Sequence, residues 1–290
     1  MNLGTTLLLG FIAGVTIVLG LPIGRLRRPA PALKHFLSAL TIGVLLFLVW
    51  DVLSAGWEPV DSALSAVHEH SGGMGPVFGY GALFVLGLAV GQLALVGYDR
   101  YLRRARPAAG TFGPGAMSID ERPYRATGVA TWSPARRLAL MIAIGIGLHN
   151  FAEGLAIGQS AASNEVSLAT VLVIGFALHN ATEGFGIVSP LAGDLDAHGA
   201  PIRPSWGFLL AMALIGGGPT FVGTAIGHGF TSDALSVIFL SLAAGSIVYV
   251  ICQLLGVAAR ARRPELLACG VLLGLLAGFL TDAIITAAGV

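Results

Sequence analysis

Charged side chains are scarce in this sequence. Asp, Glu, Lys and Arg together make up 11% of its 290 residues, whereas a soluble globular domain carries about 25%. The mean hydropathy is +0.83. This composition excludes an ordinary soluble domain and indicates a protein that crosses the membrane several times. The formal net charge is only +1, so the chain has no general basic character, and we predict no nucleic-acid partner.

Cysteine is equally sparse, and no region shows the alternating pattern of a membrane strand. Both cysteines, Cys252 and Cys269, lie in apolar segments, so a disulfide framework is not expected. The apolar runs are continuous, which excludes a transmembrane β-barrel. The first run, 1–20, has no basic residue ahead of it. We therefore interpret it as a retained helix and not as a signal peptide.

Long apolar runs dominate what remains. A membrane-spanning helix needs about 20 predominantly apolar residues. The predicted fold is therefore an all-α integral membrane protein with eight transmembrane helices. The predicted spans are 3–24, 35–55, 76–98, 136–160, 165–189, 205–228, 233–259 and 265–288.

The cationic residues are confined to alternate loops between these spans. All 16 Lys and Arg fall between helices 1 and 2, 3 and 4, 5 and 6, or 7 and 8. Under the positive-inside rule these loops are cytoplasmic and both termini lie outside. The predicted location is the plasma (inner) membrane of the cell, with the bilayer as partner. A missed or invented helix would scatter the cations over both sides, so the partition supports the count of eight.

The chain divides into segments by this reading. Residues 99–135 are rich in Pro, Gly and Arg and are predicted to form a flexible cytoplasmic loop. A shorter cytoplasmic loop is predicted at 190–204. Between them lie helices 4 and 5 (136–189). Helices 1–3 (1–98) precede this part and helices 6–8 (205–290) follow it.

One polar pattern occurs twice within apolar segments. His149-Asn150-Phe151-Ala152-Glu153-Gly154 recurs as His179-Asn180-Ala181-Thr182-Glu183-Gly184. On a helix, the His and Glu of each copy share one face. Ionisable residues within a membrane are costly and are interpreted as functional by default.

Both copies lie near the membrane midplane of two adjacent antiparallel helices. Each copy offers a nitrogen and an oxygen ligand, the donor set of a divalent transition metal. Two carboxylates facing each other without a cation would repel, and a divalent ion removes that repulsion. The neighbouring amides can add carbonyl ligands or orient the carboxylates. The predicted metal site therefore lies between helices 4 and 5, and its residues are His149, Asn150, Glu153, His179, Asn180 and Glu183.

With these motifs in the fourth and fifth of eight helices, the sequence resembles the ZIP (ZRT/IRT-like) divalent-metal transporters, nearest the GufA-like bacterial branch. The long loop between helices 3 and 4 and the outside termini fit this resemblance. It implies transport of zinc, and in related proteins iron, manganese or cadmium, toward the cytoplasm. It also implies a transport site at the six motif residues, often binuclear in relatives, and a homodimer. The metal is the substrate, and no separate cofactor is expected.

The sequence departs from this family at three auxiliary positions. Many relatives carry a Glu in helix 6, where this chain has 216–220 without a carboxylate, and a Glu in helix 7, where it has Gln253. In helix 2, where others offer His or Glu, this chain has Asp51. Helix 8 adds Asp282. A second metal would leave excess positive charge with only two motif glutamates, so we predict one high-affinity metal.

Transport by alternating access through this midplane site is the function that the sequence favours. The main alternative is a membrane protein that senses or binds metal without transporting it. A metalloprotease would show His-Glu-x-x-His, which is absent, so no enzymatic activity is expected. A polar network that only joins helices 4 and 5 would not require the same pattern twice.

Overall fold

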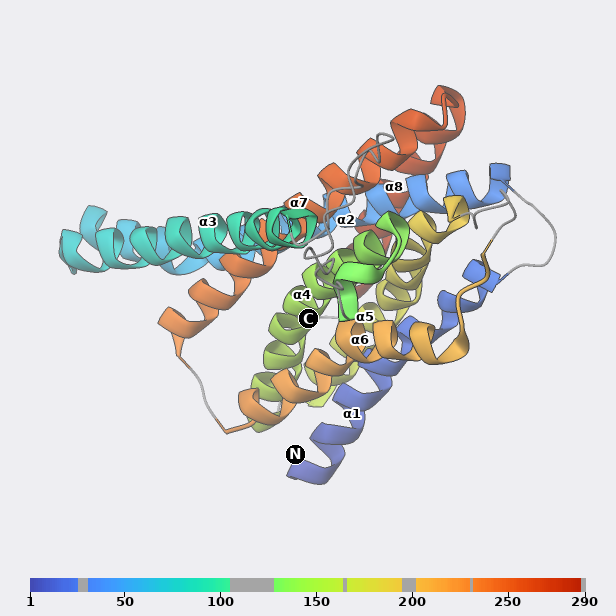
Figure 1. Cartoon of the computed structure of the whole chain (residues 1–290). Helices are drawn as coiled ribbons and strands as arrows, with labels where there is room; N and C mark the ends of the chain where they lie inside the picture. Colours follow the sequence, from blue (N-terminus) through green and yellow to red (C-terminus); the bar gives the residue numbers. More distant parts are fainter. Residues whose placement is uncertain (26–30, 105–127, 164–165, 195–201, 230–231, 288–290) are drawn as a thin grey trace, which may run out of the picture.

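The structure is a computed structural model that describes residues 1–25, 31–104, 128–163, 166–194, 202–229 and 232–287. Every regular element in those ranges is helical, and they contain no strand. The long helices are α1 (Leu3–Val15), α2 (Pro31–His68), α3 (Met74–Arg104), α4 (Pro134–Ala162), α5 (Val166–Val188), α6 (Trp206–Gly227), α7 (Asp233–Arg260) and α8 (Pro264–Ala287) (Figure 1). Short 3₁₀ turns are η1 (Thr16–Leu19), η2 (Leu21–Arg25), η3 (Gly128–Thr131) and η4 (Ser189–Gly193).

Most of these helices have the length and composition of membrane spans. Seven segments of the described chain qualify, and they comprise α1 with its two 3₁₀ turns, α2, α3, α4, α6, α7 and α8. Helix α5, with 23 residues, is not among them. The predicted all-helical membrane architecture is thus confirmed in outline, while the count of eight spans and the sides of the termini stay predictions.

The second helix is much longer than predicted. The expected span ended at residue 55, and the acidic segment after it was expected to be a loop. Instead α2 continues through Pro59 to His68, so Glu58 and Asp61 lie on the helix. Because proline costs only one backbone hydrogen bond and a local bend, a long helix can accommodate it.

The other predicted bounds differ by a few residues. Helix α3 continues to Arg104 and α4 begins at Pro134, so both enter the predicted 99–135 loop. The start of α4 has a clear local cause. The Ser133 side chain accepts a hydrogen bond from the backbone N–H of Arg136, and Pro134 occupies the first turn, a favoured combination at helix starts. Most of the predicted loop, 105–127, lies outside the described residues, as do 195–201 of the shorter one.

The first predicted helix changes geometry partway along. After Val15, the α-helix gives way to η1 and η2. The Ala13 carbonyl, at this change, accepts hydrogen bonds from the Thr16 hydroxyl at 2.6 Å and from the Asn180 side-chain amide at 3.0 Å. A side chain of α5 thus binds the backbone of α1 where its hydrogen-bond pattern changes.

Glycine holds four helices together in what we call the site bundle, made of α1, α4, α5 and α6. A Cβ at Gly154 of α4 would lie 2.1 Å from the Thr220 carbonyl oxygen of α6, and one at Gly184 of α5 would lie 2.3 Å from the Ile17 carbonyl oxygen. Lipid tails are as apolar as the side chains, so the hydrophobic effect does not drive helices together within a membrane. Close backbone packing stabilises their association instead. The last residue of each motif is therefore a packing position.

The remaining helices, α2, α3, α7 and α8, form what we call the frame bundle, which is joined in the same way. A Cβ at Gly43 of α2 would lie 2.2 Å from the Val271 carbonyl oxygen of α8, and one at Gly245 of α7 would lie 2.2 Å from the Leu88 carbonyl oxygen of α3. Figure 1 shows α2, α3, α7 and α8 together on one side of the site bundle.

The two bundles meet through side chains. A Cβ at Gly145 of α4 would first meet the Val250 Cγ2 atom of α7 at 2.6 Å, and one at Gly186 of α5 would first meet the Thr41 Cγ2 atom of α2 at 2.7 Å. The Ser246 hydroxyl of α7 also donates to the Gly145 carbonyl at 3.2 Å. Side-chain contacts repack more readily than interlocked backbones.

Candidate metal centre

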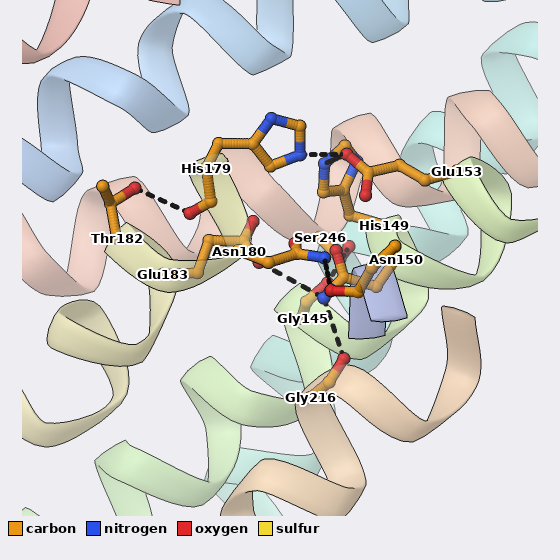
Figure 2. A network of polar contacts seen from close by, with 11 residues as sticks. Gly145, His149, Asn150, Glu153, His179, Asn180, Thr182, Glu183, Gly216 and Ser246 are labelled. Carbon is orange, nitrogen blue, oxygen red and sulfur yellow. Dashed lines mark hydrogen bonds and ion pairs between the residues drawn. The ribbon is translucent and has the colours of Figure 1, made fainter. Parts of the chain in front are cut away.

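The two motif copies face each other across α4 and α5. His149, Asn150 and Glu153 lie on α4, and His179, Asn180 and Glu183 lie on α5 (Figure 2). Five of the six residues are buried, and His179 is partly buried. The two copies lie close together across the helix pair, since the His149 and His179 ring centroids are 6.0 Å apart.

Three of these side chains converge on one point. Glu153 Oε1 lies 2.8 Å from His149 Nε2 and is also paired with His179 Nε2. One ligand atom from each of the three residues falls within 4.8 Å of the others. Two imidazoles and a carboxylate from two helices are a donor set suited to zinc and related divalent ions, with a coordination position left for a further ligand.

Glu183 lies beside this cluster in a different set of contacts. Its Oε2 accepts a hydrogen bond of 3.2 Å from the Asn150 Nδ2, which also donates to the Gly216 carbonyl of α6 at 2.9 Å. Asn150 therefore positions the second carboxylate against α6. The structure thus brings together three of the four charged motif residues and holds the fourth through an amide.

Four buried side-chain oxygens of the motif have no hydrogen-bond donor among the residues that the structure describes. They are Asn150 Oδ1, Glu153 Oε2, Asn180 Oδ1 and Glu183 Oε1. A buried acceptor without a partner costs about 1–3 kcal/mol. Two of the four are carboxylate oxygens, and carboxylates buried beside two imidazoles suit a bound cation.

The auxiliary carboxylates lie on the frame bundle. Asp51, in the middle of α2, interacts electrostatically with His149 and His179, and also with Asp282 of α8. Both aspartates are partly buried. Gln253 lies on α7, and no hydrogen bond connects it to the motif within the described part of the chain. Asp51 therefore lies within electrostatic reach of the histidines and of Asp282, but it is not part of the group of three potential ligands.

Sequence reasoning missed the contribution of α6. The Gly216 carbonyl accepts a hydrogen bond from Asn150 and the Thr220 carbonyl packs against Gly154, although the absence of a carboxylate made this helix look uninvolved. The run Gly216-Gly217-Gly218-Pro219 was the available signal. Glycines allow close approach of a helix backbone, and Pro219 has no N–H to donate to a backbone hydrogen bond within α6.

Comparison with known proteins supports the resemblance seen in the motifs. No protein-family model matches the chain. Zinc transporter ZupT of Escherichia coli (strain K12 / DH10B) is 31% identical over 159 residues, which is 54% of this chain and 51% of the relative. ZupT of Escherichia coli O157:H7 (strain EC4115 / EHEC) and of Escherichia coli O8 (strain IAI1) match equally. The chain thus spans about half the length of these curated relatives, and this similarity to zinc transporters supports its resemblance to the ZIP family.

Proposed function

We propose that this protein carries divalent transition-metal cations, with zinc as the main substrate, across the inner membrane toward the cytoplasm. The convergence of His149, Glu153 and His179 from two apolar helices is the observation on which the proposal depends. The similarity to zinc transporters supports the substrate, and seven long apolar helices in the described chain support a multi-pass membrane location. The proposal includes eight spans and both termini outside, which depend on the apolar runs and the partition of cations in the sequence. The homodimer implied by the family resemblance is part of the proposal.

The proposed mechanism uses the division into two bundles. A cation loses its water at the outer aspartates, Asp51 and Asp282, and binds the motif residues near the midplane. The site bundle then shifts against the frame bundle, where packing depends on side chains such as Val250 and Thr41. Since Asp51 lies on the frame and the motif on the site bundle, the shift carries the bound ion away from its entrance.

We propose a single high-affinity metal per chain. Within the described ranges, one group of three potential ligands meets the spacing that a metal needs, and Glu183 is hydrogen-bonded to Asn150. Equilibrium titration of purified protein with zinc, together with anomalous diffraction, counts the bound ions. Two fully occupied midplane positions would refute this proposal.

The decisive experiment is metal flux into liposomes that contain the purified protein and a zinc-sensitive dye. Wild-type protein is expected to move zinc, and iron, manganese and cadmium are tested in the same panel. The double variant Glu153→Gln and Glu183→Gln is expected to abolish uptake, because it removes both anionic ligands while retaining size and polarity.

Two controls make the result specific. The double variant must insert and melt like wild type, since a misfolded protein would also lack flux. Retained uptake by this variant would refute the assignment of the centre. Wild-type protein that binds zinc tightly but passes no ion under any gradient would instead identify a membrane metal sensor.

A further inference from the structure

A large apolar groove opens on the exposed surface of the site bundle. It has a volume of about 950 Å³ and is lined by α1, η1, α4 and α6, with one residue from α7. Figure 1 shows α1 and α6 lying beside each other, with α4 next to α6. Ligand-binding cavities for small organic molecules measure about 300–1,000 Å³. The groove is thus large enough for part of a lipid.

The chemistry of the lining admits hydrocarbon and not water. All lining residues are Gly, Ala, Val, Ile, Leu, Phe or Pro, so no side chain offers a hydrogen bond. A water needs about two to four polar partners. Among the lining residues, Phe11, Leu214 and Val222 are 54%, 73% and 50% exposed, and in a membrane they would face acyl chains.

The groove begins close to a cationic residue at the predicted cytoplasmic interface. Arg25, at the end of η2, donates a hydrogen bond to the Pro204 carbonyl and lies over the Trp206 ring, 4.9 Å from its centroid. Arg203, the residue before Pro204, is exposed. A guanidinium has five N–H donors, and no carboxylate pairs with Arg25 among the residues that the structure describes. Its remaining donors suit a phosphate.

The length of the groove, measured along α6 from Trp206 beside Arg25, fits one acyl chain. Along α6, a rise of 1.5 Å per residue puts Leu210 about 6 Å and Val222 about 24 Å beyond Trp206. The hydrocarbon half of a bilayer is about 15 Å thick. The groove therefore runs from just below the headgroup level past the midplane.

We propose that this groove binds an anionic phospholipid of the inner leaflet, with its phosphate at Arg25 and Arg203 and one acyl chain between α1 and α6. The chain would lie against the close-packed backbones of α4 and α6 at Gly147 and Gly217, which line the groove. The lipid thereby completes the packing of the site bundle. This inference depends on the membrane placement in the proposed function, but not on metal transport.

Lipid retention tests the proposal directly. Purified, delipidated protein is mixed with phosphatidylglycerol or with phosphatidylcholine of the same acyl chains, and bound lipid is counted by native mass spectrometry. We expect one phosphatidylglycerol per chain, and weaker retention of phosphatidylcholine. The double variant Leu214→Trp and Val222→Trp should lose this lipid, because indole rings fill the groove.

Matched variants distinguish lipid bound in the groove from lipid bound elsewhere on the membrane-facing surface. Leu272→Trp with Leu280→Trp places the same rings on exposed positions of α8 and should retain the lipid. Arg25→Gln should reduce the preference for phosphatidylglycerol by about fivefold, and Arg25→Lys should preserve most of it.

Three results would overturn the proposal, and none depends on zinc flux. The first is equal retention of lipid by wild type and by the variant with Leu214→Trp and Val222→Trp. The second is equal retention of phosphatidylglycerol and phosphatidylcholine by wild-type protein. The third is that the same double variant loses a dimer but keeps its lipid. The last result would identify the groove as a contact with a second copy of the chain.

Discussion

Each residue of the repeated motif has a separate physical task in the structure. The histidines and Glu153 bring ligand atoms together, and Asn150 holds Glu183 against α6. Asn180 attaches α5 to α1 through the Ala13 carbonyl. The terminal glycines, Gly154 and Gly184, let α6 and η1 approach. The pattern therefore combines ligation with the packing that keeps the ligands in position.

Asn150 provides a test at this scale. Asn150→Ala removes the amide that contacts both Glu183 and the Gly216 carbonyl, so Glu183 becomes free to turn away. Loss of such an orienting contact typically lowers metal affinity by about 10- to 100-fold, and we expect a loss in that range for zinc, measured by calorimetry in detergent.

The matched control is Asn180→Ala, whose amide contacts a backbone carbonyl and no motif carboxylate. It should lower the melting temperature more than it lowers zinc affinity. Equal zinc affinity in Asn150→Ala and wild type would contradict the positioning role.

At the scale of the elements, the closest backbone approaches occur at glycines within each bundle. Backbone approaches within the site bundle and within the frame bundle leave no space for a Cβ, as at Gly154 and Gly245. Between the bundles, Gly145 and Gly186 meet side chains first. Interlocked backbones resist relative displacement, so a conformational change should concentrate at the interface between bundles.

Alanine substitution of glycine tests this packing. Gly223→Ala in α6 would place a Cβ 2.1 Å from the Phe151 carbonyl oxygen of α4. Overpacking of this kind costs about 1–3 kcal/mol, so the melting temperature should fall, as followed by tryptophan fluorescence in detergent.

Gly97→Ala in α3 is the control, because nothing lies within 4 Å of a Cβ at that position. There the substitution should leave stability unchanged or raise it, since alanine favours helix more than glycine does by about 1 kcal/mol. If the two variants melted alike, close packing of α4 on α6 would not limit stability.

At the scale of the whole molecule, the cations define the expected orientation. In the described ranges, Arg25, Arg136, Arg203 and Arg262 all lie at helix ends or in loops on the side predicted to be cytoplasmic. The opposite ends carry acidic residues and histidines, including the exposed residues His68, Glu69 and His70. A cation approaching from outside would therefore meet negative charge first.

Thiol labelling tests this orientation. In a background with Cys252→Ala and Cys269→Ala, cysteine is introduced at Ser71 or at Arg262, both exposed. A membrane-impermeant maleimide added to intact spheroplasts should label the variant at 71 and spare the variant at 262 until the membrane is opened. The reverse pattern would invert the topology and the proposed direction of entry.

The sequence alone determined the membrane class, most helix positions and the paired motif. These features are local, because they follow from the length of apolar runs and from the spacing of residues along one helix. It placed the end of the second helix too early, since Pro59 and the acidic residues around it resemble a loop when their tertiary surroundings are unknown.

Only the tertiary structure determined which residues meet across helices. Three features each join segments far apart in the chain. They are the approach of Gly216 to Asn150, the electrostatic influence of both histidines on Asp51, and the groove lined by α1, α4 and α6. Spacing along one helix fixes a face but not the partner of that face. The choice of partner depends on where backbones can approach, which the packing of all the helices decides together.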